Sequence, residues 1–365
     1  MGRSLRRAGA LALALLALSG CPAPPGQATL PATPAPSQAQ GTTPAIDAPS
    51  APPSKKSPRP TPPPASDRVP PLSAETRPKT PSAPLLPRPG PAPIRRLWTG
   101  LLYPRALAAS PAGEVYVIDK TGLIRCLDRD GRERVQVRTP AIENGTPSAM
   151  AWHPSGRLLV ADSHYGRVLI YGPDLNLLDL WGAHGREPGR FMLLTGIAAS
   201  EDGRIYVSDQ GDDVARVQIF DLGGALLGSF GQFGSRAGEL NRPMGLAIFG
   251  EEVAVADSLN HRVQVFDLDG SAVRRWGRLG DVPGDLKYPY GLSFDASGRL
   301  FVAEQGNHRL QLVDTSPAWT FGKPGRQPGD LSSPWAVLAL GDRLFVTDGG
   351  NNRLYELAAP PAPTR

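Results

Sequence analysis

The sequence predicts an all-β protein, a six-bladed β-propeller of four-stranded antiparallel blades that follows a long proline-rich segment. Two observations carry this prediction. After residue 100 one pattern recurs six times, and each copy divides into short β-rich runs separated by turn residues. In each copy one run ends in an acid, as EVYVID, RLLVAD, RIYVSD, EVAVAD, RLFVAE and RLFVTD. The final acids lie 43, 47, 48, 47 and 44 residues apart, which is the period of a propeller blade.

Each copy can be divided into strands in order. The first strand begins at a proline in five copies, and the turn to the second strand is of the Pro154-Ser155-Gly156 kind, as hairpins require. The run that ends in the acid is the second strand. The third strand begins at an arginine, as in RVLIY, RVQIF, RVQVF, RLQLV and RLYEL. The fourth strands end at Trp181, Phe230, Trp276 and Phe321, each followed by glycine.

The sixth copy stops after its third strand, at Leu357. Residues 94–100, IRRLWTG, read as a fourth strand with its aromatic residue at Trp98, and they stand just before the first copy. We expect them to complete the sixth blade and close the ring, which removes exposed sheet edges. The predicted propeller therefore covers residues 94–357, and residues 358–365 are predicted to form a disordered tail.

The N-terminal segment, residues 1–20, has three arginines followed by the apolar run Ala8 to Leu18. This is the pattern of a secretory signal, and the run is short for a bilayer span. It ends in Leu18-Ser19-Gly20-Cys21, which resembles the lipobox of bacterial lipoproteins. The resemblance implies cleavage before Cys21 and a lipid on that cysteine. We therefore expect the protein in the bacterial cell envelope, anchored by lipid to the outer face of the cytoplasmic membrane or to the outer membrane.

Residues 21–93 are predicted to be a disordered linker, because residues 22–93 contain 24 prolines and few branched apolar side chains. The signal segment contributes +3 and residues 22–93 contribute +4 to the formal net charge of +5, so residues 94–365 carry −2. A propeller without excess positive charge lacks the main electrostatic attraction to nucleic acid. Nucleic acid is therefore not expected as a partner.

The repeat has a recognisable consensus. Pro243-x-Gly245-Leu246, NHRVQVF at residues 260–266 and Trp276-Gly277 fall within one period, and residues 307–312 repeat much of the second motif as NHRLQL. In these motifs residues 94–357 resemble NHL-repeat propellers. The resemblance implies the fold. It does not imply one activity, because such propellers include binding modules, lyases and, more distantly, lactonases.

The acid of each second strand and the arginine of the third strand recur in every blade. A catalytic group is needed once, whereas a structural pair is needed in each blade, so we interpret these residues as structural. The pairs are Asp119 with Arg125, Asp162 with Arg167, Asp209 with Arg216, Asp257 with Arg262, Glu304 with Arg309, and Asp348 with Arg353.

No catalytic constellation is predicted. In the peptidyl-α-hydroxyglycine α-amidating lyase domain, which the fold resembles, histidines after the first-strand proline supply zinc ligands. The matching residues here are Arg105, Ser148, Thr195, Met244, Tyr290 and Trp335, so that ligand set is missing. We expect no catalytic residue, metal or other cofactor. The alternative is a hydrolase or lyase with a calcium or zinc ion in the central channel, because ligands from six blades need not form a linear motif.

The expected binding surface is the end of the propeller that carries the long loops from Gly182, Gly231, Gly277 and Gly322. Around its central opening we place Arg105, Met244, Tyr290 and Trp335, residue types that are enriched in interface cores. Trp181 and Phe233 extend this face outward. The sequence favours a non-enzymatic, monomeric binding or scaffold module for a protein, peptide or glycan.

Overall fold

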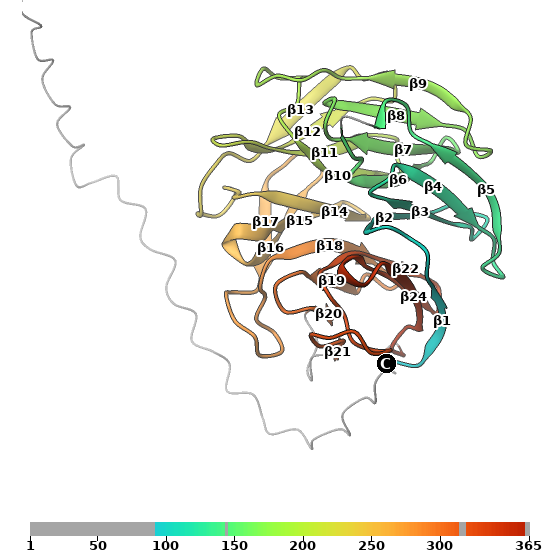
Figure 1. Cartoon of the computed structure of the whole chain (residues 1–365). Helices are drawn as coiled ribbons and strands as arrows, with labels where there is room; N and C mark the ends of the chain where they lie inside the picture. The colour runs from blue at the N-terminus through green and yellow to red at the C-terminus, as the bar shows by residue number, and fades with distance from the viewer. Residues whose placement is uncertain (1–91, 143–144, 314–318, 362–365) are drawn as a thin grey trace, which may run out of the picture. The chain divides into compact units, whose positions relative to one another are not determined.

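The computed structural model describes residues 92–142, 145–313 and 319–361. This part forms six antiparallel sheets of four strands each, arranged as the blades of a propeller (Figure 1). The all-β, six-bladed fold predicted from the repeat is therefore confirmed. The predicted signal segment, Cys21 and residues 22–91 of the predicted linker lie outside the described residues. The last two linker residues are described: Ala92 is buried in a core cluster, and the carbonyl of Pro93 accepts a hydrogen bond from the Ala358 amide at 3.0 Å. Within the described residues the structure has no helix with the length and apolar character of a membrane span.

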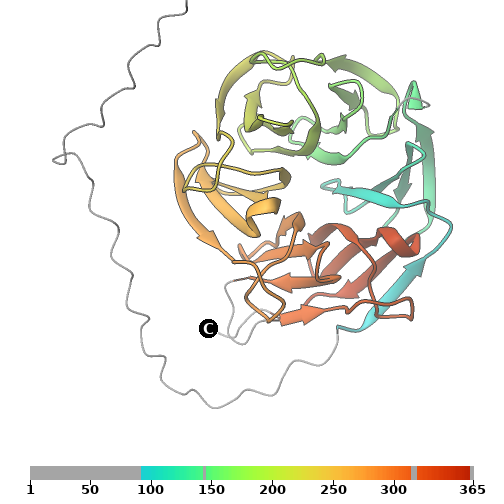
Figure 2. The same cartoon turned by 60° about the vertical axis from the view of Figure 1, so that its left-hand side comes forward.

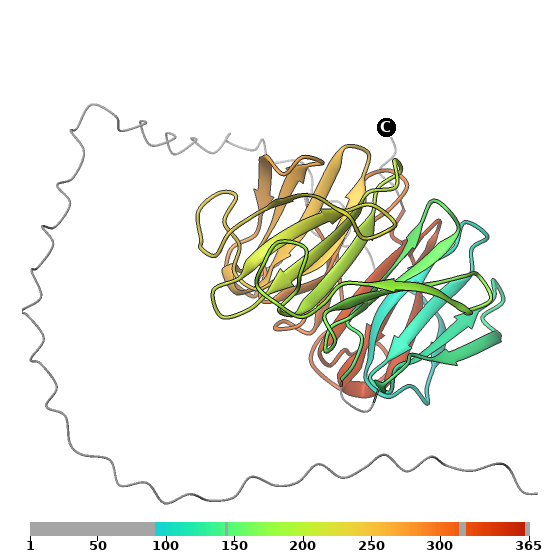
Figure 3. The same ribbon diagram turned by 90° about the horizontal axis from the view of Figure 1, so that it is seen from above.

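The blades follow the order of the chain, from cyan to red in Figures 1 and 3. Blade 1 consists of β2 (Pro104–Ala109), β3 (Val115–Asp119), β4 (Leu123–Leu127) and β5 (Glu133–Arg138). Blade 2 consists of β6 (Ala149–His153), β7 (Arg157–Asp162), β8 (Arg167–Tyr171) and β9 (Leu177–Trp181). Blade 3 consists of β10 (Leu194–Ala199), β11 (Ile205–Gln210), β12 (Ala215–Phe220) and β13 (Leu226–Phe230).

The remaining blades include two short 3-10 helices, η3 and η4. Blade 4 consists of β14 (Pro243–Phe249), β15 (Glu252–Asp257), β16 (Arg262–Asp267) and β17 (Ala272–Trp276), with η3 (Ser258–Asn260) between its second and third strands. Blade 5 consists of β18 (Pro289–Phe294), β19 (Leu300–Glu304), β20 (Arg309–Leu312) and β21 (Trp319–Phe321). Blade 6 has β22 (Pro334–Leu340), β23 (Arg343–Asp348), η4 (Gly349–Asn351) and β24 (Arg353–Ala358) from the end of the propeller.

The fourth strand of blade 6 comes from the other end of the propeller sequence. Strand β1 (Ile94–Trp98) pairs antiparallel with β24, from Ile94 opposite Leu357 to Trp98 opposite Leu354. In Figure 2 this cyan strand lies beside the red strands of the last blade. The ring is therefore closed by hydrogen bonds between residues more than 250 positions apart in the sequence.

The hydrophobic core is divided among the six junctions between neighbouring blades. The six buried clusters join blades 1 and 2, 2 and 3, 3 and 4, 4 and 5, 5 and 6, and 6 and 1. At the closing junction Leu107 and Val117 of blade 1 pack with Phe345 and Leu354 of blade 6. A second strand such as β3 is buried at every position because both faces of its blade are covered. This explains why these strands are continuous apolar runs.

Glycine in the first strand is explained by close contact between neighbouring blades around the central channel. A Cβ added to Gly245 would lie 2.4 Å from the carbonyl oxygen of Tyr290 in the next blade. At Gly196 it would lie 2.3 Å from the carbonyl oxygen of Met244. Both obstacles are backbone atoms, so any larger residue would have to push the first strands apart.

The aromatic residue that ends a fourth strand packs on the next blade. The indole Nε1 of Trp98 donates a hydrogen bond to the carbonyl oxygen of Gly131 at 3.0 Å, and that of Trp181 donates to Leu222 at 3.2 Å. A Cβ on Gly131 or on Gly224 would collide with these two indole rings. The aromatic position of the repeat is therefore a contact between outer strands and neighbouring turns.

The C-terminal end of the described chain moves the boundary of the predicted disordered tail, residues 358–365. Strand β24 includes Ala358, and the amide of Ala359 donates to the carbonyl of Asp342 at 2.9 Å; residues 362–365 lie outside the described residues. The Arg299 guanidinium donates to the carbonyl oxygens of Pro360 and Pro361, at 3.0 and 2.9 Å. An arginine of blade 5 thus holds the chain through residue 361.

Candidate functional site

The repeated acids and arginines form an ion pair in every blade. The nitrogen–oxygen distances are 2.9 Å for Arg125–Asp119, 2.7 Å for Arg167–Asp162, 3.0 Å for Arg216–Asp209, 2.7 Å for Arg262–Asp257, 2.5 Å for Arg309–Glu304 and 2.7 Å for Arg353–Asp348. All six acids are buried. Their geometry is that of a contact made once per blade between the second and third strands.

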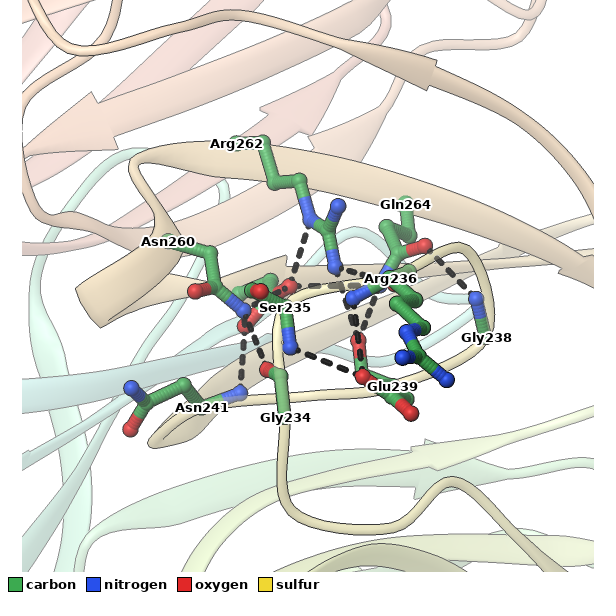
Figure 4. Close-up of polar contacts among 10 residues, drawn as sticks. Gly234, Ser235, Arg236, Gly238, Glu239, Asn241, Asn260, Arg262 and Gln264 are labelled. Atoms are coloured by element: carbon green, nitrogen blue, oxygen red, sulfur yellow. Dashed lines mark hydrogen bonds and ion pairs between the residues drawn. The ribbon is translucent and has the colours of Figure 1, made fainter. Parts of the chain in front are cut away.

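In blade 4 this ion pair is the centre of a larger network (Figure 4). The fully buried Asp257 carboxylate accepts hydrogen bonds from the Asn241 amide at 2.6 Å, from Arg262 Nε at 2.7 Å and from Gln264 Nε2 at 3.1 Å. Asn260 Nδ2 donates to the same carboxylate at 2.9 Å. The NHRVQVF motif thus places an amide, a guanidinium and a second amide around one acid.

The same side chains hold the loop that enters blade 4. Arg262 Nη2 donates to the carbonyl oxygens of Arg236 and Glu239 at 2.7 and 2.8 Å, and Gln264 Nε2 donates to that of Glu239 at 2.6 Å (Figure 4). In blades 5 and 6, Arg309 and Arg353 bond in the same way to carbonyls of the loops that precede them. The third-strand arginines of blades 4, 5 and 6 therefore hold the loops that lead into these blades.

The consensus histidines are also explained by the fold. His261 and His308 have φ of 54° and 52°, in the left-handed region that Asn and His tolerate better than most residues. His308 Nδ1 accepts a hydrogen bond from the Ser333 amide at 2.9 Å, which links blade 5 to blade 6. Asn352 occupies the same position in blade 6, and its Oδ1 accepts from the Tyr103 amide of blade 1 at 2.9 Å. These residues connect neighbouring blades.

One end of the ring carries the loops that join neighbouring blades, and we call it the loop-rich end. The central channel opens into a cavity at this end, and the contacts of the repeat do not explain this cavity. Arg105, Met244, Tyr290 and Trp335 all line the channel at this end, where the cavity has a volume of about 60 Å³. A wider cavity of about 270 Å³ adjoins it and shares Arg105, Met244 and Trp335 with it. Four of the six residues expected at the ligand-binding face are thus brought together.

Arg105 lies against aromatic rings in this cavity. Its guanidinium carbon lies 5.1 Å from the ring centre of Trp335 and 5.8 Å from that of Tyr103, within the range of cation–π contacts. Trp335 also makes an edge contact with Tyr290, with ring centres 4.9 Å apart. Burial lowers the pKa of Arg105 and raises that of Tyr290. A partly buried cation therefore lies over two aromatic rings, and a third ring, that of Tyr290, contacts one of them.

The other two expected residues lie outside the cavity. Trp181 is half-buried in the core between blades 2 and 3, where its ring centre is 4.8 Å from that of Phe220. Its placement on the ligand face is therefore corrected, because the indole serves the contact between blades. Phe233 is 53% exposed on the loop before blade 4, where its backbone forms an isolated parallel β-bridge with Leu240. It lies at the loop-rich end but does not line the cavity.

Several lining residues were missed from the sequence, among them Thr146, His164 and Arg242. Thr146 and Arg242 each stand directly before the first-strand proline of their blade, and His164 lies in the turn between the second and third strands of blade 2. The repeat alignment could have found Thr146 and Arg242, because the residue before the proline faces the same end as the residue after it. His164 has no such signal. Its place at the cavity depends on how blades 1 and 2 pack.

A metal centre would need several ligands in one place. Among residues 92–142, 145–313 and 319–361, no three His, Cys, Asp or Glu side chains are grouped closely enough to hold a metal ion. The cavity itself is lined by arginine, hydroxyl, aromatic and aliphatic side chains, with the imidazole of His164 and the amide of Gln210. One imidazole without a carboxylate differs from the ligand sets that bind calcium or zinc in proteins.

Comparisons with known proteins agree with the fold. A family model for the NHL repeat matches residues 240–266, which cover most of blade 4. No curated protein matches the sequence. The virginiamycin B lyase of Staphylococcus aureus is similar in structure, with a TM-score of 0.50, 15% identity, and coverage of 74% of this chain and 89% of that chain.

Two further solved structures are similar. A streptogramin B lyase has a TM-score of 0.51 and 14% identity over 73% of this chain and 88% of that chain. A protein of unknown function from Bacteroides thetaiotaomicron has a TM-score of 0.55 and 14% identity over 71% of this chain and 70% of that chain. At such identities the likeness concerns the fold alone. This chain is thus a six-bladed β-propeller of four-stranded antiparallel blades that carries an NHL repeat at residues 240–266.

Proposed function

We propose that this protein is a binding module of the bacterial cell envelope, and that its propeller binds a protein, peptide or glycan at the loop-rich end. The observation that carries the proposal is the central cavity, where Arg105, Met244 and Trp335 from three blades meet. The charged residues of the repeat are engaged in contacts within and between blades, and this leaves the cavity and the loops around it as the candidate recognition surface.

The loops around the cavity suit this role. Phe233 and Leu279 expose 53% and 61% of their surface on loops of the loop-rich end. Exposed apolar residues are a common feature of interaction sites. Arg262 and Gln264 donate hydrogen bonds to the Glu239 carbonyl in the loop before blade 4. Because the loop is already held in place, it would lose little conformational entropy when a ligand binds.

Site-specific crosslinking in the full chain tests this proposal. Phe233→benzoylphenylalanine places a photoreactive group at the loop-rich end. Phe249→benzoylphenylalanine is the matched control, because Phe249 is also exposed, at 41%, but lies at the turn between β14 and β15 on the opposite end. Irradiation of cells should give a defined crosslinked product from position 233 and none from position 249. Equal crosslinking from both positions, or none from 233, would contradict the proposal.

The envelope location is proposed on the Leu18-Ser19-Gly20-Cys21 segment alone. Lipid on Cys21 would anchor the chain to the membrane, and residues 22–93 would separate the propeller from the surface. Cys21→Ser removes the acceptor and should move the protein from the membrane fraction to the soluble fraction on cell fractionation. A wild-type protein that is already soluble, or a variant that stays with the membrane, would refute the anchor.

A further inference from the structure

The charge of the cavity narrows the kind of ligand. Its wider part is lined by Arg105, Arg242 and His164 among its ionisable groups, and no Asp or Glu lines either part. The propeller domain as a whole is slightly acidic, since residues 94–365 carry a formal charge of −2. The cavity is thus a positively charged site on a domain whose net charge is negative. Such a cavity attracts anions.

Arg105 differs from the arginines of the repeat. Each of those six has a carboxylate partner in its own blade, whereas the ion pairs found among the described residues include none with Arg105. Its Nη1 donates to Thr146 Oγ1 at 2.5 Å. Its Nε is buried and has no hydrogen-bond partner among the described residues. A buried N–H without an acceptor is costly, and a ligand oxygen would remove that cost.

Three hydroxyl groups that line the cavity with Arg105 already donate their hydrogen bonds within the propeller. The hydroxyls of Ser148 and Ser163 both donate to the carbonyl oxygen of Leu194, at 2.8 and 2.6 Å. Thr195 Oγ1 donates to the carbonyl of Pro243 at 2.7 Å. A sugar needs many free donors and acceptors, and these three hydroxyl protons are already used. The lining therefore favours a ligand with one anionic group and an apolar part.

The volume of the cavity sets the size of the group that enters it. At about 270 Å³ it is smaller than the roughly 300–1,000 Å³ of sites that enclose a whole drug-sized ligand. It fits one end of a longer molecule. Met244, Leu193 and the ring of Trp335 supply apolar surface next to the guanidinium.

We propose that the cavity binds the C-terminal residue of a peptide, with its α-carboxylate on Arg105 and an apolar side chain against Met244 and Trp335. The inference rests on the proposed function, because the rest of the peptide would then lie on the loop-rich end. A guanidinium and a carboxylate form a planar, charge-assisted pair. Arg242, exposed at the mouth, adds a second positive charge without taking the place of Arg105.

Equilibrium dialysis of the full chain against a defined peptide pool tests this assignment. The pool contains acetylated tripeptides, acetyl-Ala-Ala-Xaa, with each amino acid at the last position, prepared as free acids and as C-terminal amides. Mass spectrometry reads which members the protein retains. Free acids with an apolar last residue should be retained at least tenfold more strongly than their amides. Equal retention of acids and amides, or retention of none of the acids, would overturn the proposal.

Variants locate the effect. Arg105→Gln should reduce retention of the free acids at least tenfold, while Arg275→Gln, which removes an exposed arginine of β17, should leave it unchanged. Thermal melts check folding, and the comparison of acids with amides on the unmutated protein does not depend on any variant. Glucuronic acid is added in a separate arm, and stronger retention of that sugar acid than of any peptide would also overturn the peptide assignment.

The two proposals fail in different ways. If the pool is not retained but Phe233→benzoylphenylalanine still crosslinks, the loop-rich end binds a ligand and the carboxylate assignment is wrong. If position 233 gives no crosslink at all, the binding face itself is wrong. Crosslinking that persists in the Arg105→Gln background would show that the ligand does not depend on the guanidinium.

Discussion

Deleting residues 94–100 from the full chain is expected to lower the melting temperature of the propeller by roughly 10–20 °C. The deletion removes the fourth strand of blade 6, which pairs with β24 along four residue positions. It also removes Trp98, whose ring lies 6.3 Å from that of Phe345 and whose Nε1 bonds to Gly131 in blade 1. Lost ladder hydrogen bonds and buried indole surface together amount to about 5 kcal/mol of the unfolding free energy.

The matched control is a deletion of equal length, residues 50–56, in the proline-rich segment. It shortens the chain by the same seven residues and leaves all the strands of the described propeller in place, so the melting temperature should stay within about 1 °C of the parent value. Differential scanning calorimetry of both variants makes the comparison. A closing-strand deletion that melts with the parent would mean that the ring does not depend on β1 for closure.

The repeat made the fold predictable because each blade solves the same physical problem. Every second strand is covered on both faces, so it must be a continuous apolar run, and every second-strand acid must be neutralised where it is buried. The NHRVQVF motif is an example, since Asn260, Arg262 and Gln264 all donate hydrogen bonds to the buried Asp257 carboxylate. Once that pattern is counted in the sequence, the number of blades follows.

Features that occur once were harder to predict. Strand β5 (Glu133–Arg138) carries no terminal Trp-Gly or Phe-Gly, so the fourth strand of blade 1 was not located from the sequence. Trp181 shares its repeat position with Trp98, but nothing in the sequence said that this position packs on the turn of the next blade. A side chain's direction across a junction depends on both blades.

Some properties of the cavity could be predicted from the repeat, and others depend on how the blades pack. Arg105 and Trp335 could be placed near the channel because they follow the first-strand proline of their blades, and the structure puts both in the lining. The missing carboxylate partner of Arg105 and the occupied hydroxyls of Ser148 and Ser163 are properties of packing. They decide which ligand chemistry fits, and no repeat alignment contains them.

Asp257→Ala is expected to destabilise the propeller by about 3–5 kcal/mol, because it leaves the buried Arg262 guanidinium without its counter-charge. The amide of Asn241 and the side chains of Asn260 and Gln264 would lose an acceptor at the same time. Urea or thermal unfolding measures the change. Asp130→Ala is the control, since its ion pair with Arg132 is 70–78% exposed and should contribute less than about 1 kcal/mol.

A double variant distinguishes two contributions to the loss of stability. One is the destabilisation by an unpaired buried charge, and the other is the loss of the stabilising ion pair itself. Asp257→Ala combined with Arg262→Met removes the buried cation as well as the buried anion, and an apolar side chain of similar length fills its place. If the single variant is unstable because Arg262 is left unpaired, the double variant should recover part of the lost stability, so the two changes should not add. Additive losses would mean instead that Arg262 acts mainly through its bonds to the Arg236 and Glu239 carbonyls, and that the loop before blade 4 contributes more to stability than the ion pair.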